Sequence, residues 1–315
     1  MIDKHKKRLI GRKTGLLLLK FFTWVTGSLP LWWSCFVGWL VGKMFYFVVS
    51  RHRKTALESL AIAFPYKPQS ERKAIAKKSM VVMMQCGLEF FYCIKKPQLF
   101  DNIRIEGRQY LDRALKKKKG VIGVTAHFGN FPIMTVKFAK EGYPTNAIVR
   151  TMRDPEVGNF IFGLQKHFGM KTIFSDPRQV VVRDTVKALH SNELVLIQMD
   201  QNFGTGGVWV EFFGKLAATP VGPIVFGLRT GAELLPIFIV REGFGRHCIK
   251  ILPPPGLEKT DNTDETVLLN AIKFSKIIEN IIREYPVQWG WVHRRWKSRP
   301  SEQMKRARYK VQKIK

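Results

Sequence analysis

His127 is the residue whose place in the sequence most directly suggests chemistry. It follows an apolar run in the segment GVIGVTAHFGNFPIM (120–134) and stands just before a Phe, a Gly and an Asn. An imidazole can take up and return a proton near neutral pH, which is what a general base must do. A histidine can also end a strand without any chemical role, so the surrounding elements have to decide between the two interpretations.

Residues from 120 onward alternate between short apolar runs and helical patterns. The predicted strands are VIGVTA (121–126), NAIVR (146–150), KTIF (171–174), LVLIQMD (194–200), LLPIFIV (234–240) and CIKIL (248–252). The predicted helices lie near 131–141, 155–168, 179–191, 221–231 and 265–284. This alternation predicts an α/β fold with a mostly parallel central sheet flanked by helices. Sites in such sheets lie at the carboxyl ends of strands, where His127, Arg150 and Asp200 are predicted.

The N-terminal region has the composition of a membrane-contacting segment. Residues 16–50 are apolar and rich in Trp and Phe, carry two lysines as their only charges, and are divided by Gly27 and Pro30. The later piece, 31–49, is close to the roughly 20 residues that a bilayer crossing takes. We therefore predict a membrane-anchoring helical segment, spanning or interfacial, with a soluble helical hairpin as the alternative. The basic flank before it predicts a cytoplasmic N-terminus.

The charge balance is strongly basic. The chain has 53 Lys+Arg against 24 Asp+Glu, a formal net charge of +29. Such an excess predicts a polyanionic partner, either nucleic acid or an anionic membrane surface. No nucleic-acid-binding motif is recognisable and the apolar N-terminal segment does not suit that class, so we expect anionic membrane lipids and no nucleic acid. Three parts are predicted: a basic N-terminus with a membrane anchor (1–50), an α/β domain (51–300) and a basic tail (301–315).

The remaining composition restricts the chemistry further. Four cysteines without a CxxC pair predict reduced, buried thiols rather than disulfides. No His/Cys/Asp cluster has metal-ligand spacing, so no metal site is predicted. A GxxxxGK[ST] phosphate-binding loop is also absent from the sequence.

Seven blocks, in order along nearly the whole chain, carry a family resemblance. They are RHRKTALESLAIAFP (51–65), HFGNF (127–131), VRTMRDP (149–155), DQNFG (200–204), VEFFGKLAATPVGP (210–223), RTGAELLPIFIVREG (229–243) and QWGWVHRRWKSRP (288–300). Together they resemble the bacterial lipid A biosynthesis acyltransferases, the lauroyl/myristoyl transferases within the wider glycerolipid and lysophospholipid acyltransferases.

The resemblance implies an enzyme at the cytoplasmic face of the bacterial inner membrane. It would move a fatty acyl chain from a thioester, on acyl carrier protein or CoA, to a hydroxyl of a lipid A precursor or another glycolipid. The thioester would be a co-substrate, and no cofactor is expected. The resemblance further implies His127 as the base that activates the acceptor hydroxyl. Arg150 would hold a phosphate or help stabilise the oxyanion, with Arg153 as a companion.

One position departs from the family pattern of a histidine followed, after four residues, by an acid. The acid position is Pro132, which cannot orient an imidazole. Asp200 or Glu211 could supply the acid from elsewhere, or a backbone carbonyl or Asn130 could hold the ring. Alternatively, the protein has lost the chemistry and binds lipid or acyl carrier protein without catalysis.

Other residues are expected to bind substrate. Gly129 and Asn130 could offer backbone N–H groups to an anion at the start of a helix. Phe212 and Phe213 are expected to shape an acyl groove, with packing in the core as the alternative. Asp200 could also simply cap a turn.

Overall fold

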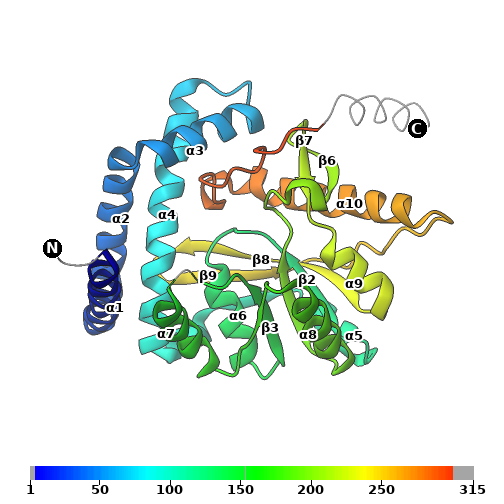
Figure 1. Cartoon of the computed structure of the whole chain (residues 1–315), viewed down its shortest axis with the longest axis horizontal. Coiled ribbons are helices and arrows are strands. Elements are labelled where there is room, and N and C mark those ends of the chain that lie inside the picture. Colours follow the sequence, from blue (N-terminus) through cyan, green and yellow to red (C-terminus); the bar gives the residue numbers. More distant parts are fainter. Residues whose placement is uncertain (1–3, 153, 301–315) are drawn as a thin grey trace.

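The computed structural model describes residues 4–152 and 154–300. Arg153 and the predicted basic tail, 301–315, lie outside the described residues. A seven-stranded sheet forms the centre, and the helices of the N-terminal part of the chain stand to one side of it (Figure 1).

The strands of the large sheet run in the order β1-β9-β8-β2-β5-β3-β4. Their bounds are β1 (Arg104–Glu106), β2 (Val121–Thr125), β3 (Thr145–Val149), β4 (Lys171–Phe174), β5 (Leu194–Gln198), β8 (Glu233–Gly243) and β9 (Arg246–Ile251). Strands β8, β2, β5, β3 and β4 are parallel, whereas β9 is antiparallel to β8 and carries β1 parallel to itself. The predicted α/β class with a mostly parallel sheet is confirmed, and all six predicted strands are present.

The helices follow the predicted alternation in the second half of the chain. They are α1 (Lys4–Ser28), α2 (Leu31–Val48), α3 (Ser50–Ala63), α4 (Gln69–Lys95), α5 (Arg108–Lys116), α6 (Phe131–Lys140), α7 (Pro155–Lys166), α8 (Arg178–His190), α9 (Gly222–Thr230) and α10 (Thr263–Glu284). Short 3₁₀ helices cover Pro97–Asn102, Gly204–Gly206 and Pro286–Gln288. A separate antiparallel hairpin joins β6 (Val208–Phe212) to β7 (Lys215–Thr219), and it was not predicted.

The sheet has a hydrophobic core on each face. Strand β5 shows the division, because alternate side chains of a strand point to opposite faces. Val195 and Ile197 belong to one buried cluster, whereas Leu194 and Leu196 belong to the other. Burial on both faces explains why the strand reads as a continuous apolar run rather than an alternating one.

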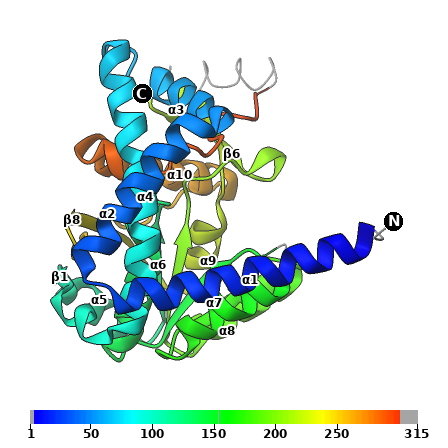
Figure 2. The ribbon, with the colours of Figure 1, turned by 90° about the vertical axis from the view of Figure 1, so that its left-hand side faces the viewer.

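Helix α4 lies between α2 and the strands β8 and β9 (Figure 1). The helices α2 and α4 pack closely, since a Cβ atom added to Gly42 would lie 2.5 Å from the Cα atom of Val81. Figure 2 shows α2 lying across α4, while α1 runs at a steep angle to α2 past α7 and α8. The predicted division near Gly27 and Pro30 falls where α1 ends and α2 begins.

Large apolar side chains are exposed on α2 and on the later part of α1. Exposed large side chains on these helices are Leu17, Phe21, Trp24, Trp32, Trp33, Phe36, Trp39, Leu40, Val41, Met44, Phe47 and Val48. Within the described residues, α2 alone is long and apolar enough to cross a membrane, with a mean hydropathy of 1.3. Only 28% of that helix is buried, which distinguishes it from a typical core helix.

A buried ion cluster fastens α4 to the sheet. The Glu89 carboxylate is fully buried, and Arg241 of β8 donates to it from Nη2 at 2.7 Å and from Nε at 3.0 Å. His247 of β9 places Nε2 3.2 Å from the second carboxylate oxygen. Burial alone would raise the pKa of Glu89, but His247 and Arg241 outweigh it and lower that pKa to about 2. The carboxylate therefore stays ionised inside the protein.

Candidate active site

His127 and Asp200 meet because of the register between two parallel strands. Strand β2 pairs with β5 so that Thr125 lies opposite Gln198. Two residues further along each chain come His127 and Asp200, both at the carboxyl edge of the sheet. Both residues lie at strand ends, as predicted, and the register brings them into contact although they are 73 positions apart in the sequence.

The buried Asp200 carboxylate fixes the imidazole of His127. Its Oδ1 lies 2.8 Å from His127 Nδ1, and its Oδ2 accepts the backbone N–H of His127 at 2.9 Å and Trp289 Nε1 at 2.7 Å. Burial raises the pKa of Asp200, but His127 and Trp289 together hold it well below its usual range. An ionised carboxylate at Nδ1 selects the tautomer with a proton on Nδ1. The basic lone pair is then on Nε2.

The Nε2 atom of His127 already has a polar neighbour. The side-chain amide of Gln201 lies 3.0 Å away and can donate to the Nε2 lone pair. Gln201 is exposed, so an incoming hydroxyl group can replace this amide. His293 lies on another side, with its ring centroid 4.9 Å from that of His127. Burial lowers the pKa of His293 to about 4, so this second imidazole is neutral at physiological pH.

The structure distinguishes the alternatives for the missing acid. Asp200 contacts the ring, whereas Glu211 lies on the exposed side of the β6–β7 hairpin. The Asn130 amide donates to the Cys86 carbonyl of α4 at 2.8 Å, so it does not hold the imidazole. Pro132 is in the first turn of α6. Asp200, which follows the neighbouring strand β5, therefore contacts the imidazole although position 132 carries no acid.

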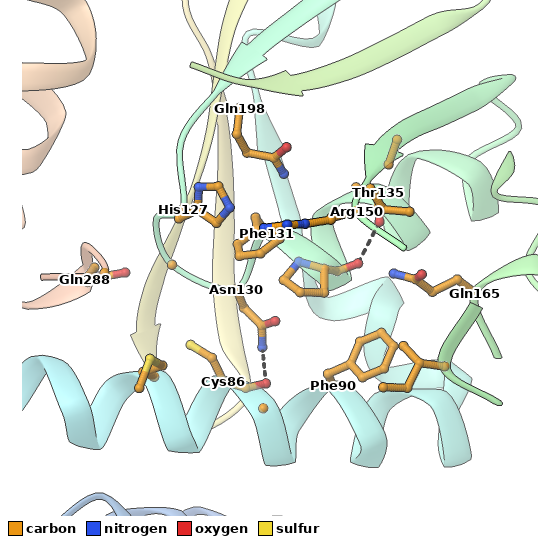
Figure 3. Close-up of a pocket in the computed structure, with 18 of the residues that line it drawn as sticks. Cys86, Phe90, His127, Asn130, Phe131, Thr135, Arg150, Gln165, Gln198 and Gln288 are labelled. Carbon is orange, nitrogen blue, oxygen red and sulfur yellow. Dashed lines mark hydrogen bonds between the residues drawn. The ribbon is translucent and has the colours of Figure 1, made fainter. Parts of the chain in front are cut away.

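A cavity of about 590 Å³ opens beside His127 (Figure 3). Its walls come from α4, α6, α7 and the end of β3. The apolar part of the lining includes Val82, Met83, Phe90, Phe91, Phe131, Pro132, Ile148, Val149, Met152, Ile161 and Phe162. A volume of this size is typical of a small-molecule site, and an apolar lining suits an alkyl chain.

The other predicted site residues fall in different places. Arg150 is exposed and borders the cavity, and it forms no ion pair with the described part of the chain. Gly129 lines the cavity at φ +55°, and a Cβ atom there would lie 1.9 Å from the Ile239 carbonyl oxygen. The backbone N–H of Gly129 donates to the Gln288 carbonyl at 2.9 Å, so it already has an acceptor. Asn130 is fully buried and also lines the cavity.

Phe212 and Phe213 do not line this cavity. Both are buried in the core, where Phe212 packs against Trp289 at 5.8 Å and Phe213 against Phe64 at 5.5 Å between ring centroids. Of the two interpretations of this pair, the position favours core packing over an acyl groove, because the hairpin that carries them folds onto α10 instead of the cavity (Figure 1).

Several residues of the site were not predicted from the sequence to belong to it. Trp289 contacts Asp200 and Gln201 contacts His127, whereas His293 and Gln165 line the cavity. The block QWGWVHRRW contains two of them and was a usable signal. Among the described residues, no group of three or more His, Cys, Asp or Glu side chains could hold a metal ion.

Replacing Pro132 by Glu is expected to give no gain in activity. Asp200 already occupies Nδ1, and a new carboxylate would enter a mostly apolar cavity, where an unpaired charge costs several kcal/mol. We expect at least about a tenfold loss in affinity for a fatty acid that occupies the cavity, measured as its Kd. Pro132→Ala is the control for the loss of the ring. A Glu variant with turnover above that of both other proteins would contradict the assignment of Asp200.

The His127 imidazole, held by a buried carboxylate beside an apolar cavity, can exchange a proton with a group next to a bound alkyl chain. The sequence model of the family of bacterial lipid A biosynthesis acyltransferases matches residues 1–298. The chain therefore belongs to this family and is an acyltransferase.

Individual relatives agree with this assignment. The chain is 25% identical to the lipid A biosynthesis palmitoleoyltransferase of Escherichia coli (strain K12), over 88% of this chain and 89% of that protein. It is 24% identical, over the same shares, to the lauroyltransferase of that organism. It is also 23% identical to a phosphatidylinositol mannoside acyltransferase of Mycobacterium tuberculosis, over 63% of this chain and 61% of that protein.

Proposed function

We propose that the protein transfers a fatty acyl chain from a thioester to a hydroxyl group of a lipid A precursor or a related glycolipid. The observation that carries the proposal is the His127–Asp200 pair beside an apolar cavity of about 590 Å³. Family membership supports acyl transfer, and the names of the relatives support a glycolipid acceptor. The donor is a thioester of acyl carrier protein or CoA.

The chemistry proceeds without a covalent enzyme intermediate. The acceptor hydroxyl replaces the Gln201 amide at Nε2 of His127 and gives its proton to that nitrogen as its oxygen attacks the thioester carbonyl carbon. Asp200 stabilises the imidazolium ion that forms. The negative charge on the carbonyl oxygen is stabilised by Arg150 and by the displaced amide of Gln201. Collapse breaks the C–S bond, and the proton on Nε2 passes to the leaving thiolate.

A transfer assay with purified protein tests this proposal. The protein in detergent is supplied with a labelled acyl thioester and a lipid A precursor, and the products are separated by mass spectrometry. We expect an ester product whose mass exceeds that of the acceptor by one acyl group, with one free thiol released per ester. Binding of both substrates without any ester, with either acyl carrier protein or CoA as donor, would support a non-catalytic family member instead.

We propose further that the protein is held at the cytoplasmic face of the bacterial inner membrane by α1 and α2. The exposed aromatic side chains of these helices support lipid contact, as aromatic residues favour the bilayer interface. The basic excess supports attraction to anionic lipids, at about 1 kcal/mol for each basic residue near the surface.

Polar substitutions on the outer face of α2 should weaken membrane binding. Trp32, Phe36 and Met44 are 61%, 45% and 56% exposed, so replacing all three by Ser leaves the core intact. Each large apolar side chain withdrawn from lipid removes about 1.5–3 kcal/mol, so we expect at least a tenfold weaker partition. The measurement is sedimentation with vesicles that contain anionic lipid. Val182→Ser/Ile272→Ser is the matched control on α8 and α10, and equal binding of both proteins would rule out this face as the anchor.

A further inference from the structure

Gln165 is a buried amide that points into the cavity. It belongs to α7, is only 7% exposed and lines the cavity that His127 borders. Its Oε1 atom has no hydrogen-bond partner among the residues that the structure describes. Figure 3 shows the amide directed from α7 toward Phe131. Leaving a buried amide without a partner costs about 1–3 kcal/mol, so the position calls for a ligand group.

Most other polar side chains of the lining have partners inside the protein. Thr135 donates to the Pro132 carbonyl at 2.8 Å, and Ser79 donates to the Ala76 carbonyl at 2.9 Å. The Gln288 amide is bonded at both ends to the backbone of Arg241. These groups therefore present no unmet hydrogen bond to an occupant of the cavity.

The Gln165 amide is remote from the reacting atoms. In Figure 3 His127 and Gln165 lie on opposite sides of the cavity, and Asn130 and Phe131 lie between them. The Oδ1 atom of Asn130 also has no partner. Its amide nitrogen, however, donates to the Cys86 carbonyl of α4, and Asn130 lies on the His127 side of the cavity. A chain whose thioester carbon is at His127 passes Phe131 before it comes to Gln165.

We propose that Gln165 forms a subsite for a hydroxyl group on the acyl chain, so that the cavity prefers a hydroxylated acyl donor with the hydroxyl remote from the thioester. The inference rests on the proposed function, because it takes the acyl chain as the occupant of the cavity. A plain alkyl chain would bury the amide and supply nothing to it. A chain hydroxyl in the cavity can accept a hydrogen bond from Nε2, the end of the amide that is not closed off by the protein.

Competitive binding of free fatty acids tests the subsite without any turnover. A fluorescent fatty acid is displaced by acids of one chain length, either unsubstituted or with a hydroxyl at successive positions along the chain. We expect at least one hydroxylated isomer to compete about tenfold better than the plain acid with the wild-type protein. In Gln165→Leu and Gln165→Met this preference should vanish, while the plain acid binds as tightly as before or more tightly. Gln179→Leu, an exposed change on α8, should leave the preference unchanged.

Two results would overturn the subsite. One is a wild-type protein that binds the plain acid at least as tightly as every hydroxylated isomer, which means that water alone satisfies Gln165. The other is a preference that survives in both Gln165 variants. If Gln165 contacted the pantetheine arm of the donor instead, the variants would weaken plain and hydroxylated thioesters equally and leave the binding of free acids unchanged.

The same proteins separate this inference from the proposed function. In the transfer assay, wild type and Gln165→Leu could both transfer plain and hydroxylated chains with equal kcat/KM. This result would overturn the subsite but agree with the proposed transferase function. A preference for hydroxylated acids that depends on Gln165, in a protein that transfers none of the thioesters, would sustain the subsite and contradict the transferase.

Discussion

Asp200→Asn is expected to lower the rate of acyl transfer by about 10⁴, the loss that follows removal of the orienting carboxylate in serine proteases. Asn keeps the shape of the side chain but removes the charge that stabilises the imidazolium ion. Its NH₂ group would also face Nδ1 of His127 and favour the tautomer with the proton on Nε2. His127→Ala should lose at least as much, because it removes the proposed base. The measurement is single-turnover transfer from a labelled thioester.

Controls separate this effect from damage to the fold. Asp184→Asn, a partly exposed carboxylate on α8 that pairs with Arg183, should retain full activity. Asp200 also accepts the indole N–H of Trp289, so near-ultraviolet circular dichroism is sensitive to any disturbance around this residue. We expect the spectrum of the variant to match that of the wild type. An Asp200→Asn protein that keeps more than a tenth of the wild-type rate would exclude the carboxylate as the partner of the base.

Glu89→Gln is expected to destabilise the protein by about 3–5 kcal/mol, because it leaves the Arg241 charge buried without a counter-ion. Only 11% of the Arg241 side chain is exposed, so water cannot take over the role of the carboxylate. The free energy of unfolding can be followed by tryptophan fluorescence in urea and detergent. Since the pKa of folded Glu89 is lowered to about 2, its contribution is present above the ordinary value of 4.5 and is lost as the pH falls toward 2.

Two further variants serve as controls for the Glu89 prediction. Glu71→Ala breaks the exposed Lys67–Glu71 pair and should cost no more than about 0.5 kcal/mol. Glu89→Leu combined with Arg241→Met should cost less than Glu89→Gln, since apolar replacement of a whole buried pair is often tolerated. A loss below 1 kcal/mol for Glu89→Gln would show that the cluster does not fasten α4 to the sheet.

The sequence predicts the central sheet well because the buried parallel strands are short, apolar and regularly spaced. The β6–β7 hairpin escapes prediction for a local reason. Its turn places Phe213 at φ +53°, a conformation that bulky residues rarely adopt. The Glu279 carboxylate of α10 accepts the Phe213 N–H at 2.8 Å and holds the turn from outside. A tertiary contact of this kind leaves no pattern within the hairpin itself.

The site was predictable to the extent that strand ends determine it. His127, Arg150 and Asp200 follow from the α/β pattern, but the choice of Asp200 over Glu211 needs the β2–β5 register, which the sequence does not contain. Trp289 comes from the far end of the chain, so no spacing rule connects it to Asp200. Phe212 and Phe213 have the composition expected of an acyl groove, and only their packing distinguishes them from one.

Helix α4 separates the apolar outer helix from the cavity. Val81 meets Gly42 of α2, while Val82, Met83 and Phe90 line the cavity. A helix with its side chains is about 10 Å across. With α2 immersed in lipid, as proposed, the reaction would take place one helix diameter from the leaflet. An acceptor could then keep its hydrocarbon tails among neighbouring lipids and present only its hydroxyl to the enzyme, so that no molecule need leave the membrane to be modified.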